Sequence, residues 1–329
     1  MPFSLMSGAA RPQIGVDVDF AARLLRGGKL AAFATETVYG LGALASDKKA
    51  VAAMYALKGR PSAHPSIIHL ADFGEAEKWA RIPPAAKKLA AAFMPGALTL
   101  LLPGLSGGAV ALRVPAHPQA RLLLQKTGGG IAAPSANRFG KISPTTAAHV
   151  RAEFPRADLY ILDGGECALG IESTIAGCLD GRLFLLRPGA VAAEDIAAAA
   201  EMPLSPPPAI AAPGRLPSHY APRKPLALFS AEALHAMPPV LRLKLPPPRG
   251  ETEIAAAEAA VLSRRRPAKT APELWRNAAA CPREYARRLY GLLRELDETP
   301  APAILAETPP ETPEWAAIRD RLTRASGGG

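Results

Sequence analysis

Cysteine is scarce in this sequence, and its three copies, Cys167, Cys178 and Cys281, are isolated and lack the spacing of metal ligands. A zinc site or a disulfide framework needs paired or closely spaced cysteines, so we expect free thiols and a reducing, cytoplasmic setting. The common signatures of nucleotide-binding enzymes are also missing, since there is no Walker A sequence, no dinucleotide fingerprint and no kinase motif set. A G-x-S-x-G elbow of the serine hydrolases is absent as well. The sequence therefore matches none of these single-motif enzyme classes.

Long apolar runs are absent too. No window holds about 18 uninterrupted apolar residues, and the opening thirteen residues lack the apolar and basic regions of a signal peptide. We therefore expect no membrane span. Aromatic residues make up only 5% of a chain that is 49% hydrophobic, so we expect a core built from layers of small aliphatic side chains.

Positive charge and proline are abundant. The chain has 39 Lys and Arg against 29 Asp and Glu, a net charge of +10. This excess of positive charge favours anionic partners such as nucleotides or RNA. A general preference for arginine in the composition, without any such partner, explains the excess equally well. Many of the 35 prolines fall after Glu201, where MPLSPPPAIAAPGRLPSHYAPRKP excludes regular structure. At 329 residues the chain is long enough for two domains, and this segment is the expected connection between them.

Short apolar runs alternate with helical patterns before that segment. The patterns predict helices over 19–28, 47–57, 84–93 and 118–130, and strands over 30–35, 66–70, 98–103, 109–115, 131–135, 159–165, 173–178 and 183–189. They indicate an α/β or α+β domain with a mixed, twisted sheet. Beyond the segment we expect strands over 226–230, 240–245 and 303–307, an amphipathic helix over 283–298 and a last helix over 313–325.

Five polar clusters follow or precede the predicted strands and helices, at 35–42, 58–60, 134–137, 170–175 and 186–189. Such positions form the sites of many α/β proteins. Lys58 and Arg60 could clamp a polyphosphate, although cations also commonly decorate the end of a helix. Ser135 and Asn137 could bind a phosphate or a ribose, or could cap a loop. Each cluster alone is a weak signal.

The order of these clusters along the chain, together with the residues that surround them, is a more specific signal than any one cluster. The sequence resembles the YrdC-like domain of the threonylcarbamoyl-AMP synthase family in the phrases ATETVYGLG, LKGRPSAHPSIIHL, MPGALTL, ALRVPAHP, APSANRFGKISPT, GIESTI and LRPGA. This resemblance covers about Asp17 to Ala200. After the Pro-rich segment, the phrases SHYAP, EYARRLYGLLRELD and WAAIRDRL are similar, more loosely, to the long two-domain form of the family.

The resemblance implies a fold and an activity. The implied fold is a YrdC-like twisted mixed sheet with flanking helices over 14–200, a linker or lid over 201–224, and a smaller C-terminal α/β, Rossmann-like domain over 225–329. The implied activity is the synthesis of threonylcarbamoyl-AMP from L-threonine, bicarbonate and ATP, with release of pyrophosphate and with Mg²⁺ on the nucleotide. The family implies that a downstream tRNA threonylcarbamoyl transferase uses the product for tRNA modification.

The resemblance also assigns residues. Four positions match the tetrad of the family's nucleotide site and are the expected catalytic residues: Lys58, Arg60, Ser135 and Asn137. We expect ATP to be bound by these four together with His64, Arg187 and Tyr220, although the family pattern usually has Asn where His64 stands. The positions that match threonine contacts are Thr37, His69, Arg113, Ala133 and Ser173. No protein metal site is expected.

Two other functions remain open at this point. A basic, sheet-rich domain could be a non-catalytic module that binds double-stranded RNA, although the only Arg-rich run is Arg264–Arg266 and interleaved aromatics are missing. A direct tRNA contact of the enzyme stays open for the same reason. Carbamoyl transfer in hydrogenase maturation uses a related domain, but the zinc-finger and acylphosphatase-like segments of those proteins are absent here.

Overall fold

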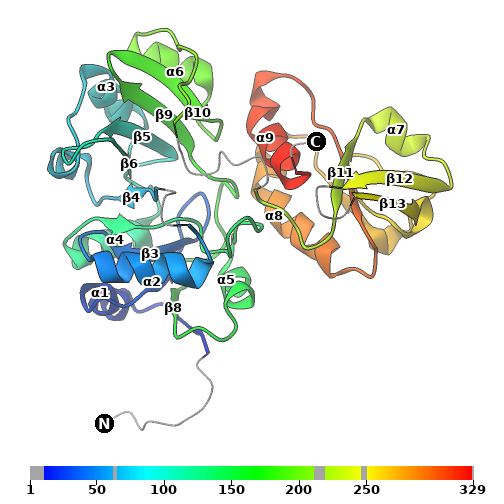
Figure 1. The fold of residues 1–329 in the computed structure, drawn as a ribbon, viewed down its shortest axis with the longest axis horizontal. Helices are drawn as coiled ribbons and strands as arrows, with labels where there is room; N and C mark the ends of the chain where they lie inside the picture. The colour runs from blue at the N-terminus through cyan, green and yellow to red at the C-terminus, as the bar shows by residue number, and fades with distance from the viewer. Residues whose placement is uncertain (1–10, 62–64, 211–218, 246–249, 328–329) are drawn as a thin grey trace.

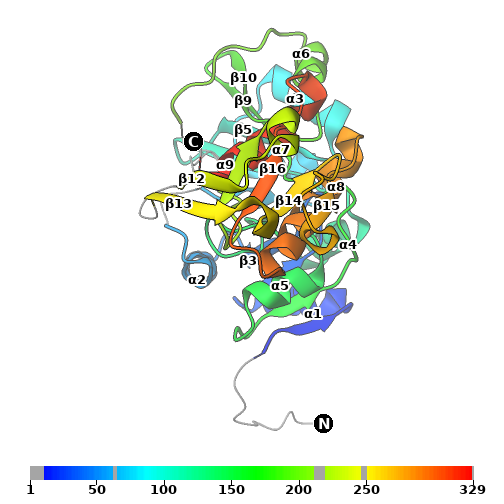
Figure 2. The same cartoon turned by 90° about the vertical axis from the view of Figure 1, so that its right-hand side faces the viewer.

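The computed structural model describes residues 11–61, 65–210, 219–245 and 250–327. Two lobes lie side by side, and the second lobe turns helices α8 and α9 towards the first (Figure 1). The view at right angles places the second lobe in front of the first, consistent with this arrangement (Figure 2). Within the described residues, no helix is long and apolar enough to cross a membrane.

The first lobe is built on a ten-stranded sheet in the order β1-β8-β2-β3-β7-β4-β6-β5-β9-β10. Parallel pairs such as β5 with β9 and antiparallel pairs such as β9 with β10 both occur, so the sheet is mixed as predicted. The strands are β1 (Gln13–Gly15), β2 (Ala31–Phe33), β3 (Gly40–Leu44), β4 (Ile68–His69), β5 (Leu98–Pro103), β6 (Ala109–Arg113), β7 (Ile131–Ala132), β8 (Tyr160–Leu162), β9 (Thr174–Leu179) and β10 (Arg182–Arg187).

Three pairs of helices flank this sheet. Apolar clusters join α1 and α4 to strands including β2 and β7, and α2 and α5 to another set that includes β3 and β8. A further cluster joins α3 and α6 to the strands at the β10 end. The helical segments are α1 (Val18–Arg26), α2 (Lys48–Lys58), the 3-10 helix η1 (Phe73–Lys78), α3 (Pro84–Phe93), α4 (Pro118–Thr127), α5 (Ala147–Glu153) and α6 (Ala193–Ala200).

The second lobe has a four-stranded parallel sheet, β11-β16-β14-β15, and an antiparallel hairpin, β12-β13. Its strands are β11 (Leu226–Phe229), β12 (Val240–Leu245), β13 (Gly250–Ala255), β14 (Ala260–Ser263), β15 (Trp275–Asn277) and β16 (Ile304–Glu307). Its helical segments are α7 (Ala231–His235), η2 (Ala256–Glu258), η3 (Pro272–Leu274), α8 (Pro282–Glu298), η4 (Pro313–Trp315) and α9 (Ala316–Ala325). The parallel sheet and its helices fit the Rossmann-like expectation, whereas the domain limits themselves stay a prediction.

Several element predictions were wrong in detail. No strand was predicted within the polar cluster at 35–42, yet its last three residues belong to β3 (Gly40–Leu44), which pairs with β2 and β7. The strand expected over 131–135 ends at Ala132, since the N–H of Ala133 instead donates to the carbonyl of Ile67 and the chain then bends towards a pocket. The strand expected over 66–70 likewise shortens to Ile68–His69. Strand β13, rich in polar residues, was not predicted.

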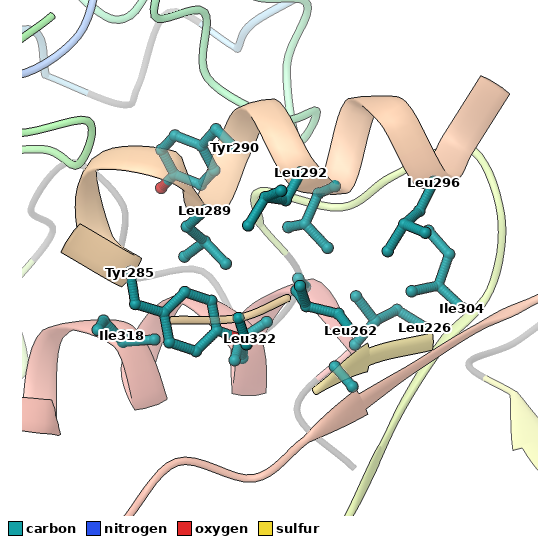
Figure 3. Packing of buried hydrophobic residues seen from close by; sticks show 14 of the residues in the cluster. Leu226, Leu262, Tyr285, Leu289, Tyr290, Leu292, Leu296, Ile304, Ile318 and Leu322 are labelled. Carbon is teal, nitrogen blue, oxygen red and sulfur yellow. The ribbon is translucent and has the colours of Figure 1, made fainter. Parts of the chain in front are cut away.

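Helix α8 contributes many of the buried apolar side chains in the core of the second lobe. Its amphipathic pattern was predicted, and Leu289, Leu292 and Leu296 are buried against β14, β16 and α9 (Figure 3). The same cluster continues across the lobes to Val38 and Ile171 of the first lobe. The two lobes therefore share one apolar core at their junction.

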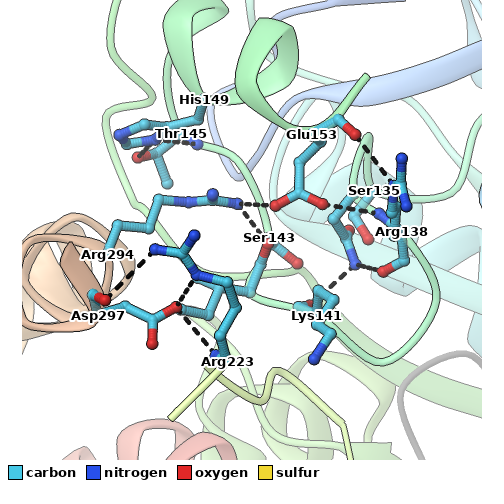
Figure 4. Close-up of polar contacts among 12 residues, drawn as sticks. Ser135, Arg138, Lys141, Ser143, Thr145, His149, Glu153, Arg223, Arg294 and Asp297 are labelled. Carbon is cyan, nitrogen blue, oxygen red and sulfur yellow. Dashed lines mark hydrogen bonds and ion pairs between the residues drawn. The ribbon is translucent and has the colours of Figure 1, made fainter. Parts of the chain in front are cut away.

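Polar contacts surround that shared core. The guanidinium of Arg294 on α8 donates to the carbonyl of Ile142 at 2.6 Å and to Glu153 at 3.0 Å, both in the first lobe (Figure 4). Arg223, just before β11, donates to Asp297 at the end of α8. These contacts fix α8 to the first lobe and to the segment that enters the second.

Glu172 of the first lobe makes the most buried polar contact at the junction. Its carboxylate accepts hydrogen bonds from Ser143 at 2.5 Å, from Tyr290 of α8 at 2.8 Å and from Arg321 of α9 at 2.8 Å. Burial alone would raise the pKa of Glu172, but Arg321 and Arg187 nearby hold it down to about 2. The carboxylate is therefore charged at neutral pH.

We expect Leu289→Ala to lower the free energy of unfolding by about 2–5 kcal/mol, because it removes a fully buried side chain and leaves a cavity. Chemical denaturation followed by tryptophan fluorescence measures this, with Trp315 in the same cluster. Leu105→Ala, at a side chain that is 54% exposed, is the control and should change stability by less than about 0.5 kcal/mol. Equal effects of the two variants would contradict the packing described for α8.

We expect the stability difference between the wild type and Glu172→Gln to depend on pH. The folded-state pKa of Glu172 is lower than its ordinary value of 4.5, so its contribution is present above that value and lost as the pH falls towards 2. The difference should reach about 3 kcal/mol near pH 6 and shrink towards pH 3, measured by denaturation at each pH. Glu253→Gln, which alters an exposed pair with Arg242, should change stability little at either pH. A pH-independent difference for Glu172→Gln would count against a charged, paired carboxylate.

Candidate functional site

A pocket of about 540 Å³, its open mouth included, lies where several strands of the first lobe end or begin. The segments after β2 and β7, the segment before β9 and the segment that leads into β4 supply most of its wall, together with Arg60 and the residues that end β6 and β10. His219 and Tyr220, from the segment between the lobes, cover part of it. Most of the predicted site residues line this pocket, namely Thr37, Arg60, His69, Arg113, Ala133, Ser135, Ser173, Arg187 and Tyr220.

Backbone hydrogen bonds hold the segment after β2 and the segment after β7 together. The N–H of Leu41 donates to the carbonyl of Pro134, and the N–H of Ala136 donates to the carbonyl of Tyr39. Gly40 lies so close to the second segment that a Cβ there would be 3.2 Å from the Cβ of Ala133. The loops after β2 and β7 therefore form one rigid wall, which explains why polar residues from both reach the same space.

Arg113 and its neighbours form one side of the pocket. Its guanidinium donates to Glu36 at 2.6 Å and to the hydroxyl of Thr37 at 2.8 Å, while its Nε donates to the carbonyl of Gly96. Burial opposes the charge of Glu36, but Arg113 lowers the pKa of this carboxyl overall. The guanidinium is therefore held in one orientation at the pocket wall.

Ser173 lies immediately before β9, and Arg187 ends the neighbouring strand β10. The Ser173 hydroxyl is 2.7 Å from that of Thr99, and Arg187 donates to both the carbonyl and the hydroxyl of Ser173. The turn after Arg187 packs tightly here, since a Cβ on Gly189 would lie 2.3 Å from the backbone nitrogen of Thr174. This close approach holds the end of β10 against the start of β9.

Two predicted residues, Lys58 and Asn137, lie outside the pocket lining. Gly59 ends α2 with a left-handed φ of 62°, and the buried ammonium of Lys58 donates to the carbonyls of Ser135 and Asn137. Burial and the charge of Arg60 lower the pKa of Lys58 to about 7. The amide nitrogen of Asn137 donates to the carbonyls of Arg138 and Lys141, so both side chains brace the loop that carries Ser135.

Arg60 lies across the same glycine from Lys58 and reaches the pocket. Its guanidinium donates to the carbonyl of Pro65 at 2.8 Å and lies over the ring of Tyr55 at 5.7 Å. The remaining predicted ATP ligand, His64, lies outside the described residues.

The histidines of the pocket are neutral at neutral pH. Burial lowers the pKa of both His69 and His219 to about 3, and the charge of Arg113 adds to this effect at His69. In the described part of the chain, the Nδ1 atoms of both rings and the hydroxyl of Tyr220 are buried without a hydrogen-bond partner. A ligand or water in contact with these atoms would supply the missing partner.

The predicted set omitted some residues that line the pocket. Thr35, Val38, Ser66 and Ile67 also contribute to it, and each is adjacent to a predicted residue or strand. Glu172 lines it as well. Its neighbourhood was singled out by the phrase GIESTI, but no role was assigned to it. No cluster of three or more His, Cys, Asp or Glu residues suited to a metal ion occurs among the residues that the structure places.

Comparison with known proteins agrees with this architecture. A family profile described as "Telomere recombination" matches residues 23–189, and one described as "Threonylcarbamoyl-AMP synthase, C-terminal domain" matches residues 190–327. The threonylcarbamoyl-AMP synthases of Bacillus subtilis (strain 168) and Pyrococcus abyssi (strain GE5 / Orsay) are each 38% identical, over 94% of this chain and 92% and 94% of their own lengths.

A solved structure is similar over both lobes. The crystal structure of Pyrococcus abyssi Sua5 complexed with L-threonine matches with a TM-score of 0.80 and 33% identity, covering 97% of this chain and 98% of that one. The sheet-rich lobe and the parallel-sheet lobe are thus shared. The chain belongs to the threonylcarbamoyl-AMP synthase family, in its two-domain form.

Proposed function

We propose that this protein is a nucleotidyltransferase that converts L-threonine, bicarbonate and ATP into threonylcarbamoyl-AMP and pyrophosphate. The observation that supports the proposal is a single pocket in which one set of residues suits a polyphosphate and another suits an amino acid. Arg60, Arg187 and Ser135 suit a polyphosphate, whereas Thr37 and Arg113 suit an amino acid. The names of the similar proteins and the threonine-bound relative support the same reaction.

Threonine would occupy the side formed by the loop after β2 and the end of β6. Arg113 offers a fixed guanidinium for the carboxylate, since Glu36 and Thr37 already orient it. The neutral ring of His69 and the hydroxyl of Ser173 offer hydrogen bonds to the amine or the side-chain hydroxyl. Ala133 adds a small apolar surface beside them.

ATP would occupy the side formed by α2, the loop after β7 and the end of β10. Arg60 and Arg187 would neutralise phosphate charge, and Ser135 would bind a phosphate oxygen. Lys58 and Asn137 would act from behind the wall, and a bound polyphosphate would favour the charged form of Lys58. Tyr220 would close this side, and the expected contact of His64 stays a prediction.

Magnesium fits this donor set. The hydroxyl of Ser135 lines the pocket and offers a hard oxygen ligand, and the Oδ1 atom of Asn137, behind the wall, is buried without a hydrogen-bond partner among the described residues. Mg²⁺ would arrive mainly on the triphosphate and supply charge neutralisation there.

The chemistry needs positioning rather than a nucleophilic side chain. The threonine amine attacks the carbon of bicarbonate, a C–O bond of bicarbonate breaks, and the lost oxygen leaves as water with the amine's proton, which gives a carbamate. One carbamate oxygen then attacks the α-phosphorus, and the α–β P–O bond breaks with its electron pair leaving on pyrophosphate. Aligned substrates and fixed cations suffice for such a transfer. The carbamate and the mixed anhydride react with water, so His219 and Tyr220 would also protect them by covering the pocket.

The labile product must then be passed to an acceptor. A downstream tRNA threonylcarbamoyl transferase is the consumer that the family implies. A non-catalytic module for double-stranded RNA is the weaker alternative, because the buried polar groups converge on one pocket rather than on a broad open face. A direct tRNA contact and a cytoplasmic location remain predictions.

We expect pyrophosphate release from ATP to depend strictly on both L-threonine and bicarbonate, because the nucleophile forms only from the two together. A coupled pyrophosphate assay, with each compound omitted in turn and bicarbonate removed by degassing, measures this. L-Serine in place of threonine tests the amino-acid side of the pocket. Release that ignores either compound would rule out the proposed reaction.

We expect Arg60→Ala to lower kcat/KM by about a hundredfold or more, because a charge-neutralising group at the phosphates is lost. Thermal denaturation should show a folded protein. Arg156→Ala, at an exposed arginine of the same lobe, is the matched control and should retain full activity. If Arg60→Ala is unfolded, the role of Arg60 is structural. If it is folded and fully active, Arg60 has no role in the reaction.

A further inference from the structure

A carboxylate of the pocket wall is held in place largely by the other lobe. Glu172 lines the pocket, yet two of its three side-chain hydrogen-bond donors, Tyr290 and Arg321, belong to α8 and α9. The third donor, Ser143, comes from the first lobe. The orientation of this part of the pocket wall therefore depends on the docking of the second lobe.

Arg321 connects that carboxylate to the segment between the lobes. Its side chain is 0% exposed, its Nε donates to Glu172, and its Nη1 donates to Asp320 at 2.7 Å. The guanidinium carbon lies over the ring of Tyr220, 5.2 Å from its centre. One buried cation thus contacts both the pocket wall and the residue that covers the pocket.

Tyr220 is held in an unfavourable backbone conformation by these groups. Its φ is 62°, which is uncommon for a residue with a large side chain. The ring stacks on Tyr290 with centres 5.8 Å apart, in addition to its contact with Arg321. Packing from α8 and α9 therefore supports the conformation in which Tyr220 lines the pocket.

Backbone hydrogen bonds anchor the segment that contains Tyr220 to both lobes. The N–H of His219 donates to the carbonyl of Arg324 on α9, and the N–H of Ala221 donates to the carbonyl of Gly140 in the first lobe. Arg324 in turn donates to Asp320, the acidic partner of Arg321. The segment is thus held between α9 and the loop that follows Asn137.

Stability alone does not require this ion pair. A buried charge pair costs desolvation, and well-packed apolar residues often replace such pairs without loss of stability. The pair instead fixes the orientation of the side chains around it, because a planar guanidinium can donate to a carboxylate and contact an aromatic ring at the same time.

We propose that Arg321 and Tyr290 are positioning residues for nucleotide binding, which hold Glu172 and Tyr220 in the conformation that completes the ATP side of the pocket. The second lobe would therefore be part of the nucleotide site without touching the nucleotide. The inference rests on the proposed function, because it assigns this side of the pocket to ATP.

The first test separates KM from kcat in the pyrophosphate assay. Arg321→Gln should raise KM for ATP about tenfold or more and change kcat at saturating ATP by less than about threefold, because binding is lost equally from ground and transition states. Arg321→Lys keeps the charge but loses the planar fork, so its KM should be intermediate. The double variant Glu172→Gln/Arg321→Gln should raise KM no further than the worse single variant. An unchanged KM for ATP, or additive effects, would overturn the proposal.

The second test displaces the lobe without altering the ion pair. Gly170 has a φ of 71°, and a Cβ there would lie 2.2 Å from the carbonyl oxygen of Arg287 on α8. Gly181 has the same φ of 71° but no atom within 4 Å of such a Cβ. Gly170→Ala should therefore raise KM for ATP, whereas Gly181→Ala, with equal backbone strain, should not. Equal effects of the two variants would contradict the dependence on docking.

A third measurement does not depend on activity. Amide hydrogen exchange at His219 and Ala221 should become faster in Arg321→Gln, while exchange in the sheet of the first lobe stays unchanged. Equilibrium dialysis with ATP alone should show weaker binding by the same variant. If the wild type releases no threonine-dependent pyrophosphate, the proposed reaction fails, but exchange and ATP binding still decide the role of Arg321. Unchanged exchange and unchanged ATP binding would refute that role.

Discussion

The arrangement of the site depends on one buried ion pair between the lobes, formed by Glu172 and Arg321. Each charge has been removed from water, so each requires its partner and its hydrogen bonds to remain ionised inside the protein. Meeting that requirement fixes the position of α9 relative to the start of β9. Because Arg321 also lies over Tyr220, the same contact determines how the segment between the lobes covers the pocket.

The chemistry that we propose follows from how the pocket orients its polar groups. Arg113 is directed by Glu36 and Thr37, and the loop that carries Ser135 is braced from behind by Lys58. Such fixed groups do not need to reorganise when charge develops on transferring atoms. A reaction between a carbamate and a phosphate anhydride benefits from this arrangement, since its main demands are alignment and charge neutralisation.

Much of the pocket could be predicted because its residues occur in short contiguous phrases at strand ends. Thr37 and Ser135 belong to such phrases, and the structure places both in one pocket. The inward orientation of Lys58 could not be predicted, because it depends on the left-handed turn at Gly59 and on carbonyls almost eighty residues away. The pairing of Glu172 with Arg321 spans 149 residues and two lobes. Its only trace in the sequence is a cation on the apolar face of the last helix.

The most direct test of the account is to identify the product formed from ¹³C-bicarbonate, L-threonine and ATP by rapid quenching and mass spectrometry. The account predicts one adduct that contains threonine, one labelled carbon and AMP, formed in equal amount with pyrophosphate. An AMP adduct of threonine without the labelled carbon, or pyrophosphate formed without any such adduct, would contradict it.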